Sequence, residues 1–123
     1  MALPTLGQAM PEFYDTHAHL DFPDFREEVD EVVQRAADAG ISRIVTIGTE
    51  LESSRRAIDL AKRFDGVFAA VGWHPNDCLS APDDVRGELE GLAKAPKVVA
   101  IGEIGTDHYR LPSTRGGSAI DDE

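Results

Sequence analysis

Hydrophobic residues along the chain form two kinds of pattern. Four short apolar runs, at 13–17, 41–48, 67–72 and 98–102, have the length and continuity of strands that are buried on both faces. Between them, apolar residues recur at helical spacing and predict amphipathic helices over 24–39, 51–64 and 82–93. The predicted order is therefore β-α-β-α-β-α-β.

Strands that alternate with amphipathic helices in this way are typical of a parallel sheet covered by helices. The pattern alone leaves two architectures open, a doubly wound open sheet and a (β/α) barrel. No Gly-x-Gly-x-x-Gly sequence follows the first run, so a dinucleotide-binding site has no support. We expect residues 1–11 to be a flexible tail and 111–123 to be loop or disorder, because neither has a helical or strand period.

Composition narrows the cellular setting. The 123 residues are a usual length for one domain, and no apolar run is long enough for a membrane helix. The start of the chain has no basic or sustained apolar segment, which predicts a cytoplasmic protein. Cys78 is the single cysteine, which fits a reducing compartment and excludes a cysteine zinc cluster. A net charge of −11 disfavours generic binding to polyanions. A nucleic-acid substrate would therefore require metal ions or a local basic patch.

The unusual polar residues follow the predicted strands. His17 and His19 end the first, His74 follows the third, and Glu103 follows the fourth. Carboxyl ends of parallel strands meet at one rim, which is the functional face of such folds. We therefore expect these four side chains to lie at the same rim.

His17 and His19 are two residues apart, so alternation along a strand predicts that both point to one side. Two neutral imidazoles on one side suit zinc, manganese, nickel or iron. Asp15 shares that side and could orient an imidazole as an outer acceptor. The alternative is that the two histidines end a strand and bond to nearby carboxylates.

Glu103 and His74 each allow more than one role. A carboxylate among apolar residues and glycines is costly to bury unless it is paired or metal-bound, and a glutamate can bridge two ions. The alternative for Glu103 is a partly exposed acid at a turn. His74, between Trp73 and Pro75, could be a ligand, an acid or base, a donor to an anionic substrate, or a histidine held in a tight turn.

Three stretches together resemble the N-terminal half of the TatD-like metal-dependent deoxyribonucleases, within the amidohydrolase-like barrel superfamily; they are DTHAHLDF at 15–22, VGWHPND at 71–77 and AIGEIGTDHYR at 100–110. The resemblance implies that 12–110 form the first four βα units of a (β/α)8 TIM-type barrel. It implies that His17 and His19 bind metal, that Glu103 bridges two divalent ions (Mg, Mn or Zn), and that His74 lies near the substrate. The implied reaction is phosphodiester hydrolysis on DNA, with no catalytic residue assigned.

The chain also departs from this family. Thr106 and His108 stand where leucine and often tyrosine are usual, and the resemblance places two further histidine ligands and an aspartate in a second barrel half. One alternative is another hydrolase of the superfamily, a deaminase or an aminoacyl-tRNA esterase. A lysine that could be carboxylated after the fourth strand would favour this alternative, but Glu103 occupies that place. Others are an inactive truncated product and a homodimer that rebuilds a barrel. A half barrel leaves its first and last strands as unpaired edges.

Overall fold

The computed structural model describes residues 11–108, which contain four strands and three α-helices. The strands are β1 (Phe13–Ala18), β2 (Ile41–Ile47), β3 (Val67–Val71) and β4 (Val98–Ile101), and the helices are α1 (Val29–Asp38), α2 (Leu51–Arg63) and α3 (Arg86–Ala93). Two 3-10 turns, Pro23–Phe25 and Pro75–Ser80, complete the regular structure. The predicted segment 111–123, and all of the predicted tail 1–11 except Pro11, fall outside the described residues.

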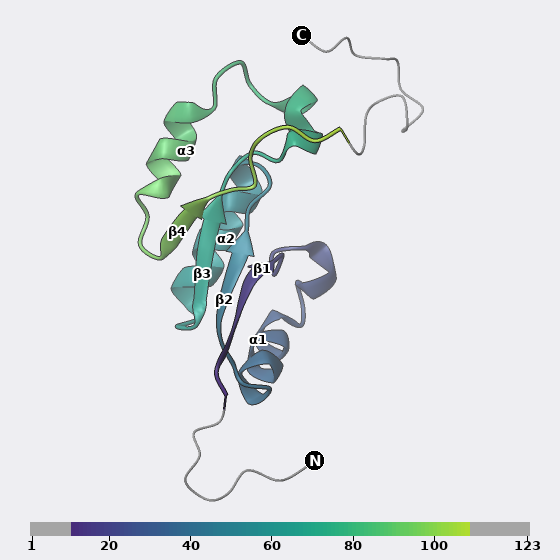
Figure 1. Cartoon of the computed structure of the whole chain (residues 1–123), viewed down its shortest axis with the longest axis vertical. Coiled ribbons are helices and arrows are strands. Elements are labelled where there is room, and N and C mark those ends of the chain that lie inside the picture. The colour runs from purple at the N-terminus through teal and green to yellow at the C-terminus, as the bar shows by residue number, and fades with distance from the viewer. Residues whose placement is uncertain (1–10, 109–123) are drawn as a thin grey trace, which may run out of the picture.

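The four strands form one parallel sheet in the order β1-β2-β3-β4 (Figure 1). Each strand thus pairs with the next one in the sequence, as in a (β/α) barrel. A doubly wound sheet instead reverses the strand order at a switch point. The observed order therefore decides between the two architectures that the sequence pattern left open.

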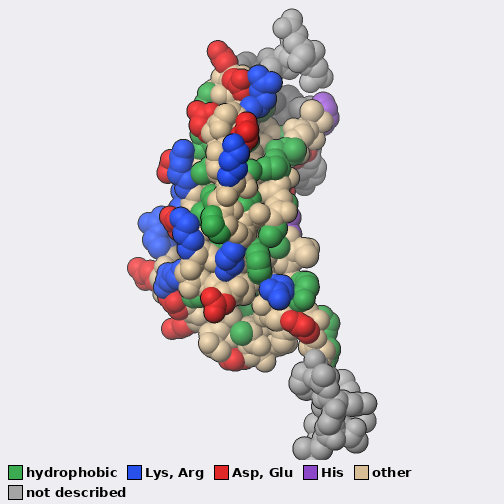
Figure 2. All heavy atoms as spheres, turned by 90° about the vertical axis from the view of Figure 1, so that its left-hand side faces the viewer, with side chains coloured by type: hydrophobic (Ala, Val, Ile, Leu, Met, Phe, Trp, Pro, Cys, Tyr) green, Lys and Arg blue, Asp and Glu red, His purple; other side chains and the backbone are tan. Residues whose placement is uncertain are grey.

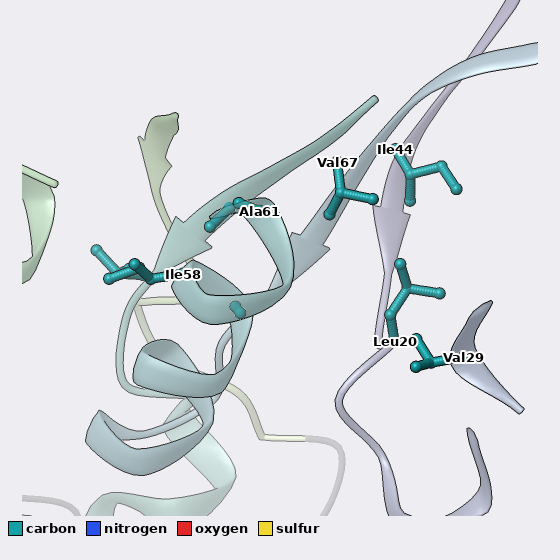
Figure 3. Close-up of a cluster of buried hydrophobic side chains, with 9 residues drawn as sticks. Leu20, Val29, Ile44, Ile58, Ala61 and Val67 are labelled. Atoms are coloured by element: carbon teal, nitrogen blue, oxygen red, sulfur yellow. The ribbon is translucent and has the colours of Figure 1, made fainter. Parts of the chain in front are cut away.

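The helices cover one face of this sheet and build the core there. Strand residues Ile44, Val67 and Val71 belong to one buried cluster with Ala57 and Ala61 of α2, which are fully buried. Figure 3 shows two further core residues, Leu20 and Val29, beside Ile44 where the chain leaves β1 and enters α1. The core therefore lies between the sheet and its helices.

The two edge strands are exposed. Tyr14 of β1 and Val99 of β4 are 57% and 55% exposed, and Ile101 is 50% exposed. Figure 2, viewed from the α3 and β4 side, shows exposed hydrophobic side chains interspersed with charged ones on this side of the molecule. The prediction that 13–17 is a buried strand is therefore wrong, because β1 is an edge strand whose neighbours cover only one side.

Helix α2 is anchored at both ends. At its start, Glu50 and Ser53 form a reciprocal capping box, in which the Ser53 hydroxyl accepts from the Glu50 N–H at 3.0 Å. At its end, the Lys97 ammonium donates to the carbonyls of Phe64 and Asp65 at 2.7 and 3.1 Å. Because Lys97 directly precedes β4, this contact also fixes where β4 begins.

Two helices start later than their hydrophobic pattern predicts. Helix α1 begins at Val29 rather than residue 24, because Phe25, Arg26 and Glu28 donate to carbonyls three residues back and form tight turns. Helix α3 begins at Arg86 rather than residue 82. There the Asp84 carboxylate accepts from the Arg86 N–H at 2.9 Å and holds a turn in place of a helix.

In the part of the chain that the structure describes, no helix has both the length and the apolarity that crossing a membrane requires. The cytoplasmic location stays a prediction from the sequence.

Candidate metal centre

Three of the predicted site residues meet at one point. His17 lies in β1, His19 follows it directly, and Glu103 follows β4. One ligand atom from each lies within 4.8 Å of the others, and His17 Nε2 is 3.6 Å from Glu103 Oε1. Because β1 and β4 are opposite edges of the sheet, they would be roughly 14 Å apart if it were flat. Sheet curvature and the length of the side chains together close this gap.

The imidazole of His19 is held in a defined orientation. Its Nδ1 lies 3.1 Å from the carbonyl oxygen of Ile47, so Nδ1 carries the proton and donates, which leaves the lone pair of Nε2 free. Its ring stacks on Phe22, with centroids 4.6 Å apart and planes at 16°, and meets the His17 ring edge-on at 5.1 Å. A histidine that ligates metal is normally oriented by such a hydrogen bond from its second nitrogen.

Asp15 has a different role from the one that strand alternation suggested. Its carboxylate accepts from the backbone N–H of His17 at 3.0 Å. The group that orients the His19 imidazole is instead the Ile47 carbonyl of the neighbouring strand. Asp15 therefore fixes the backbone where the two histidines leave β1.

His74 is beside the cluster but presents a proton rather than a lone pair. Its Nδ1 accepts from the Asn76 N–H at 3.0 Å, so a neutral imidazole carries its proton on Nε2. This Nε2 atom lies 3.7 Å from Glu103 Oε2, and the His74 side chain is 20% exposed. The backbone N–H of His74 donates to the Thr49 carbonyl at 2.8 Å and ties the turn to the end of β2. Of the roles that the sequence left open, this geometry favours a hydrogen-bond donor.

Glu103 is positioned by close backbone packing between β3 and β4. Gly102 donates to the Val71 carbonyl at 2.9 Å. A Cβ on Gly72 would lie 2.5 Å from the carbonyl carbon of Gly102 and 2.7 Å from the backbone carbonyl oxygen of Glu103. The two backbones can approach this closely only because residue 72 has no side chain. Glu103 is consequently held between His17 and His74.

A hollow of about 260 Å³ opens beside the cluster. It is lined by His19, Phe22, Thr49, His74, Asn76, Asp77 and Glu103. Sequence reasoning assigned no role to Phe22 or Asn76. Both lie in the motif stretches, at 15–22 and 71–77, and their proximity to the strand ends was the available signal.

Comparison with known proteins places the chain among metal-dependent hydrolases. The family model of the TatD-related DNases matches residues 14–117, and the chain belongs to this family. It is 43% identical over 100 residues to the uncharacterized metal-dependent hydrolase YjjV of Escherichia coli K12. It is 38% identical over 101 residues to the 3'-5' ssDNA/RNA exonuclease TatD of Cronobacter turicensis.

Solved structures show the same relationship. The crystal structure of YjjV, a TatD homologue from E. coli K12, matches 80% of this chain with a TM-score of 0.73 and 38% identity. A TatD-family hydrolase from Entamoeba histolytica matches 85% of it with a TM-score of 0.71 and 28% identity. The match covers 39% and 40% of those two chains, and this chain spans 38% of the length of the two curated relatives. The predicted fold, the first part of a TIM-type barrel, is confirmed.

Proposed function

We propose that the chain carries part of a two-metal site that hydrolyses phosphodiester bonds of DNA. The observation that carries this proposal is the convergence of His17, His19 and Glu103 at one rim of the sheet. The name of the Cronobacter relative, a 3'-5' ssDNA/RNA exonuclease, supports a nucleic-acid substrate. The family match supports metal-dependent hydrolysis.

The donor set fits divalent metal ions. His17 and His19 offer imidazole nitrogens, and Glu103 offers carboxylate oxygens, a combination that suits zinc or manganese and tolerates magnesium at the carboxylate. The two oxygens of Glu103 face different histidines, His17 at 3.6 Å and His74 at 3.7 Å, so this carboxylate can serve two positions. Bound divalent ions would polarise the phosphate and lower the pKa of an attacking water.

The chain's own residues complete part of this chemistry. His17 and His19 would hold metal, and Glu103 would hold it from the opposite sheet edge while its charge offsets that of the ions. His74, whose proton is fixed on Nε2, donates to a phosphate oxygen and so orients the substrate. Because the chain spans 38% of its relatives' length, we infer that further ligands come from a second barrel half. Those ions would also neutralise the phosphate repulsion that a net charge of −11 creates.

A direct test measures Mn²⁺ binding by calorimetry and cleavage of an end-labelled single-stranded DNA oligonucleotide. We expect metal-dependent cleavage that is lost in His17→Ala and Glu103→Gln. His108→Ala is the matched control, because His108 is an exposed histidine outside the cluster. Absence of Mn²⁺ binding by the unmodified chain, or Mn²⁺ binding or cleavage by His17→Ala equal to that of the unmodified chain, would overturn the proposal.

A further inference from the structure

Phe22 is a large aromatic residue that does not belong to the hydrophobic core. It is 40% exposed, whereas nearby Leu20 and Val29 are 5% and 6% exposed. Several other exposed hydrophobic residues, such as Tyr14 and Val99, belong to the strands at the sheet edges. Phe22 instead lies in the turn after β1, where its ring rests on the His19 imidazole. Packing in the core therefore does not account for its position.

We propose that Phe22 is the stacking platform for the base of the nucleotide whose phosphate lies at the metal cluster. This inference rests on the proposed function and names how that site holds its substrate. Phe22 lines the same hollow as His74 and Glu103, so a molecule in the hollow meets the aromatic ring and the site together. The His19 imidazole covers one face of the Phe22 ring, so a base would stack on the opposite face, roughly 4.5 Å from the Phe22 ring, centroid to centroid.

The charges around the hollow favour an aromatic contact. No lysine or arginine occurs among the described residues that line it, while Asp77 and Glu103 are acidic. The common ion-pair contacts to the nucleic-acid backbone are thus absent from this lining. An uncharged base face is not repelled by the carboxylates, and stacking on an aromatic ring is the interaction that the lining offers.

Stacking of this kind defines the substrate class. Every base has a π-face, so a ring platform accepts all four bases with little preference. A base within a duplex already stacks on its neighbours and cannot offer a face to Phe22 without leaving the helix. A ring platform would therefore suit the single-stranded substrates that the name of the Cronobacter relative gives.

The test compares oligonucleotide binding by the unmodified chain, Phe22→Leu and Phe22→Trp in the presence of Mn²⁺. Each is measured with a single strand bearing a terminal phosphorothioate linkage, to prevent cleavage, and with the same strand lacking its terminal base. We expect Phe22→Leu to raise the Kd for the intact strand roughly 5- to 150-fold, the range expected for one stacked base. The Kd for the abasic strand should not change, and Phe22→Trp should restore binding.

Phe22→Leu keeps an apolar side chain and removes no metal donor, so its Mn²⁺ affinity should match that of the unmodified chain. Equal effects of Phe22→Leu on the intact and abasic strands, or a fall in Mn²⁺ affinity, would make Phe22 a structural support of His19 and overturn the inference. If the unmodified chain binds no oligonucleotide with Mn²⁺ present, the proposed function itself fails. Binding that is normal and indifferent to Phe22→Leu defeats only the stacking role.

Discussion

Gly72→Ala tests how the site depends on the packing of β3 against the end of β4. The new Cβ would lie 2.5 Å from the Gly102 carbonyl carbon and 2.6 Å from its oxygen, and ordinary contacts begin at 3.4 Å. The backbone at Gly102 and Glu103 must therefore retreat by roughly 0.9 Å. Both colliding groups are backbone, so no side-chain rotation relieves the contact. We expect the free energy of unfolding to fall by about 1–3 kcal/mol, as for other overpacked sites.

The same displacement should weaken metal binding. Ligand distances in metal sites hold to about 0.2 Å, so a shift several times larger at Glu103 removes it from a productive position. We expect the Mn²⁺ affinity to fall by about 10- to 100-fold, the loss typical of a disturbed supporting contact. Calorimetric titration with Mn²⁺ and urea denaturation measure the two effects separately.

Gly91→Ala is the matched control. A Cβ on Gly91 meets nothing within 4 Å, and this residue lies inside α3. The control should gain up to about 1 kcal/mol of stability through helix propensity and leave Mn²⁺ affinity unchanged. If Gly72→Ala binds Mn²⁺ as well as the unmodified chain and unfolds at the same urea concentration, close packing at residue 72 does not position Glu103.

Three further outcomes follow from the structure. Thr46→Val should cost about 1–3 kcal/mol in urea denaturation, because the Thr46 hydroxyl accepts from the buried Leu20 N–H at 3.1 Å, whereas Thr46→Ser should lose much less. The Arg86 side chain lowers the pKa of Asp84. Their contact therefore stabilises the fold at pH values above the ordinary carboxyl pKa, and this stabilisation is lost as acid protonates Asp84. In Arg86→Ala, NMR titration should show a higher Asp84 pKa than in the unmodified chain. Val99→Lys should reduce concentration-dependent self-association in sedimentation, because Val99 is 55% exposed on edge strand β4; unchanged association would point to another surface.

The sequence predicted the order of strands and helices along the chain and the ligand candidates, because both depend on local pattern. His17 lies near the carboxyl end of β1 and Glu103 follows β4, and parallel strands bring such positions to one rim. The acceptor for His19 could not be predicted, because Ile47 lies 28 residues away and contributes a backbone carbonyl. The proton position on His74 likewise depends on a local bond from Asn76 that residue types do not reveal.

The residue at which a helix begins and the exposure of a strand both depend on tertiary contacts, which the periodicity of hydrophobic residues does not encode. The period placed residues 24–28 in a helix, but Asp21 in the preceding turn pairs with Arg56 of α2, and the chain between forms tight turns. Strand β1 reads as apolar and buried, yet Tyr14 is exposed because only one face and one edge of that strand are covered. Burial requires knowledge of which elements surround a strand, and the strand's own residues cannot supply it.

The placement of the candidate ligands on opposite edges of the sheet has a consequence for folding. His17 lies in the first strand, β1, and Glu103 follows the last strand, β4. An ion bound by both would therefore cross-link residues near the two ends of the described chain. Neither end can leave the fold without releasing the ion. Metal at 100 times its Kd would then add about 2.7 kcal/mol to the free energy of unfolding. Strand β4 would depend on the ion most, because it is a short edge strand and the last described element.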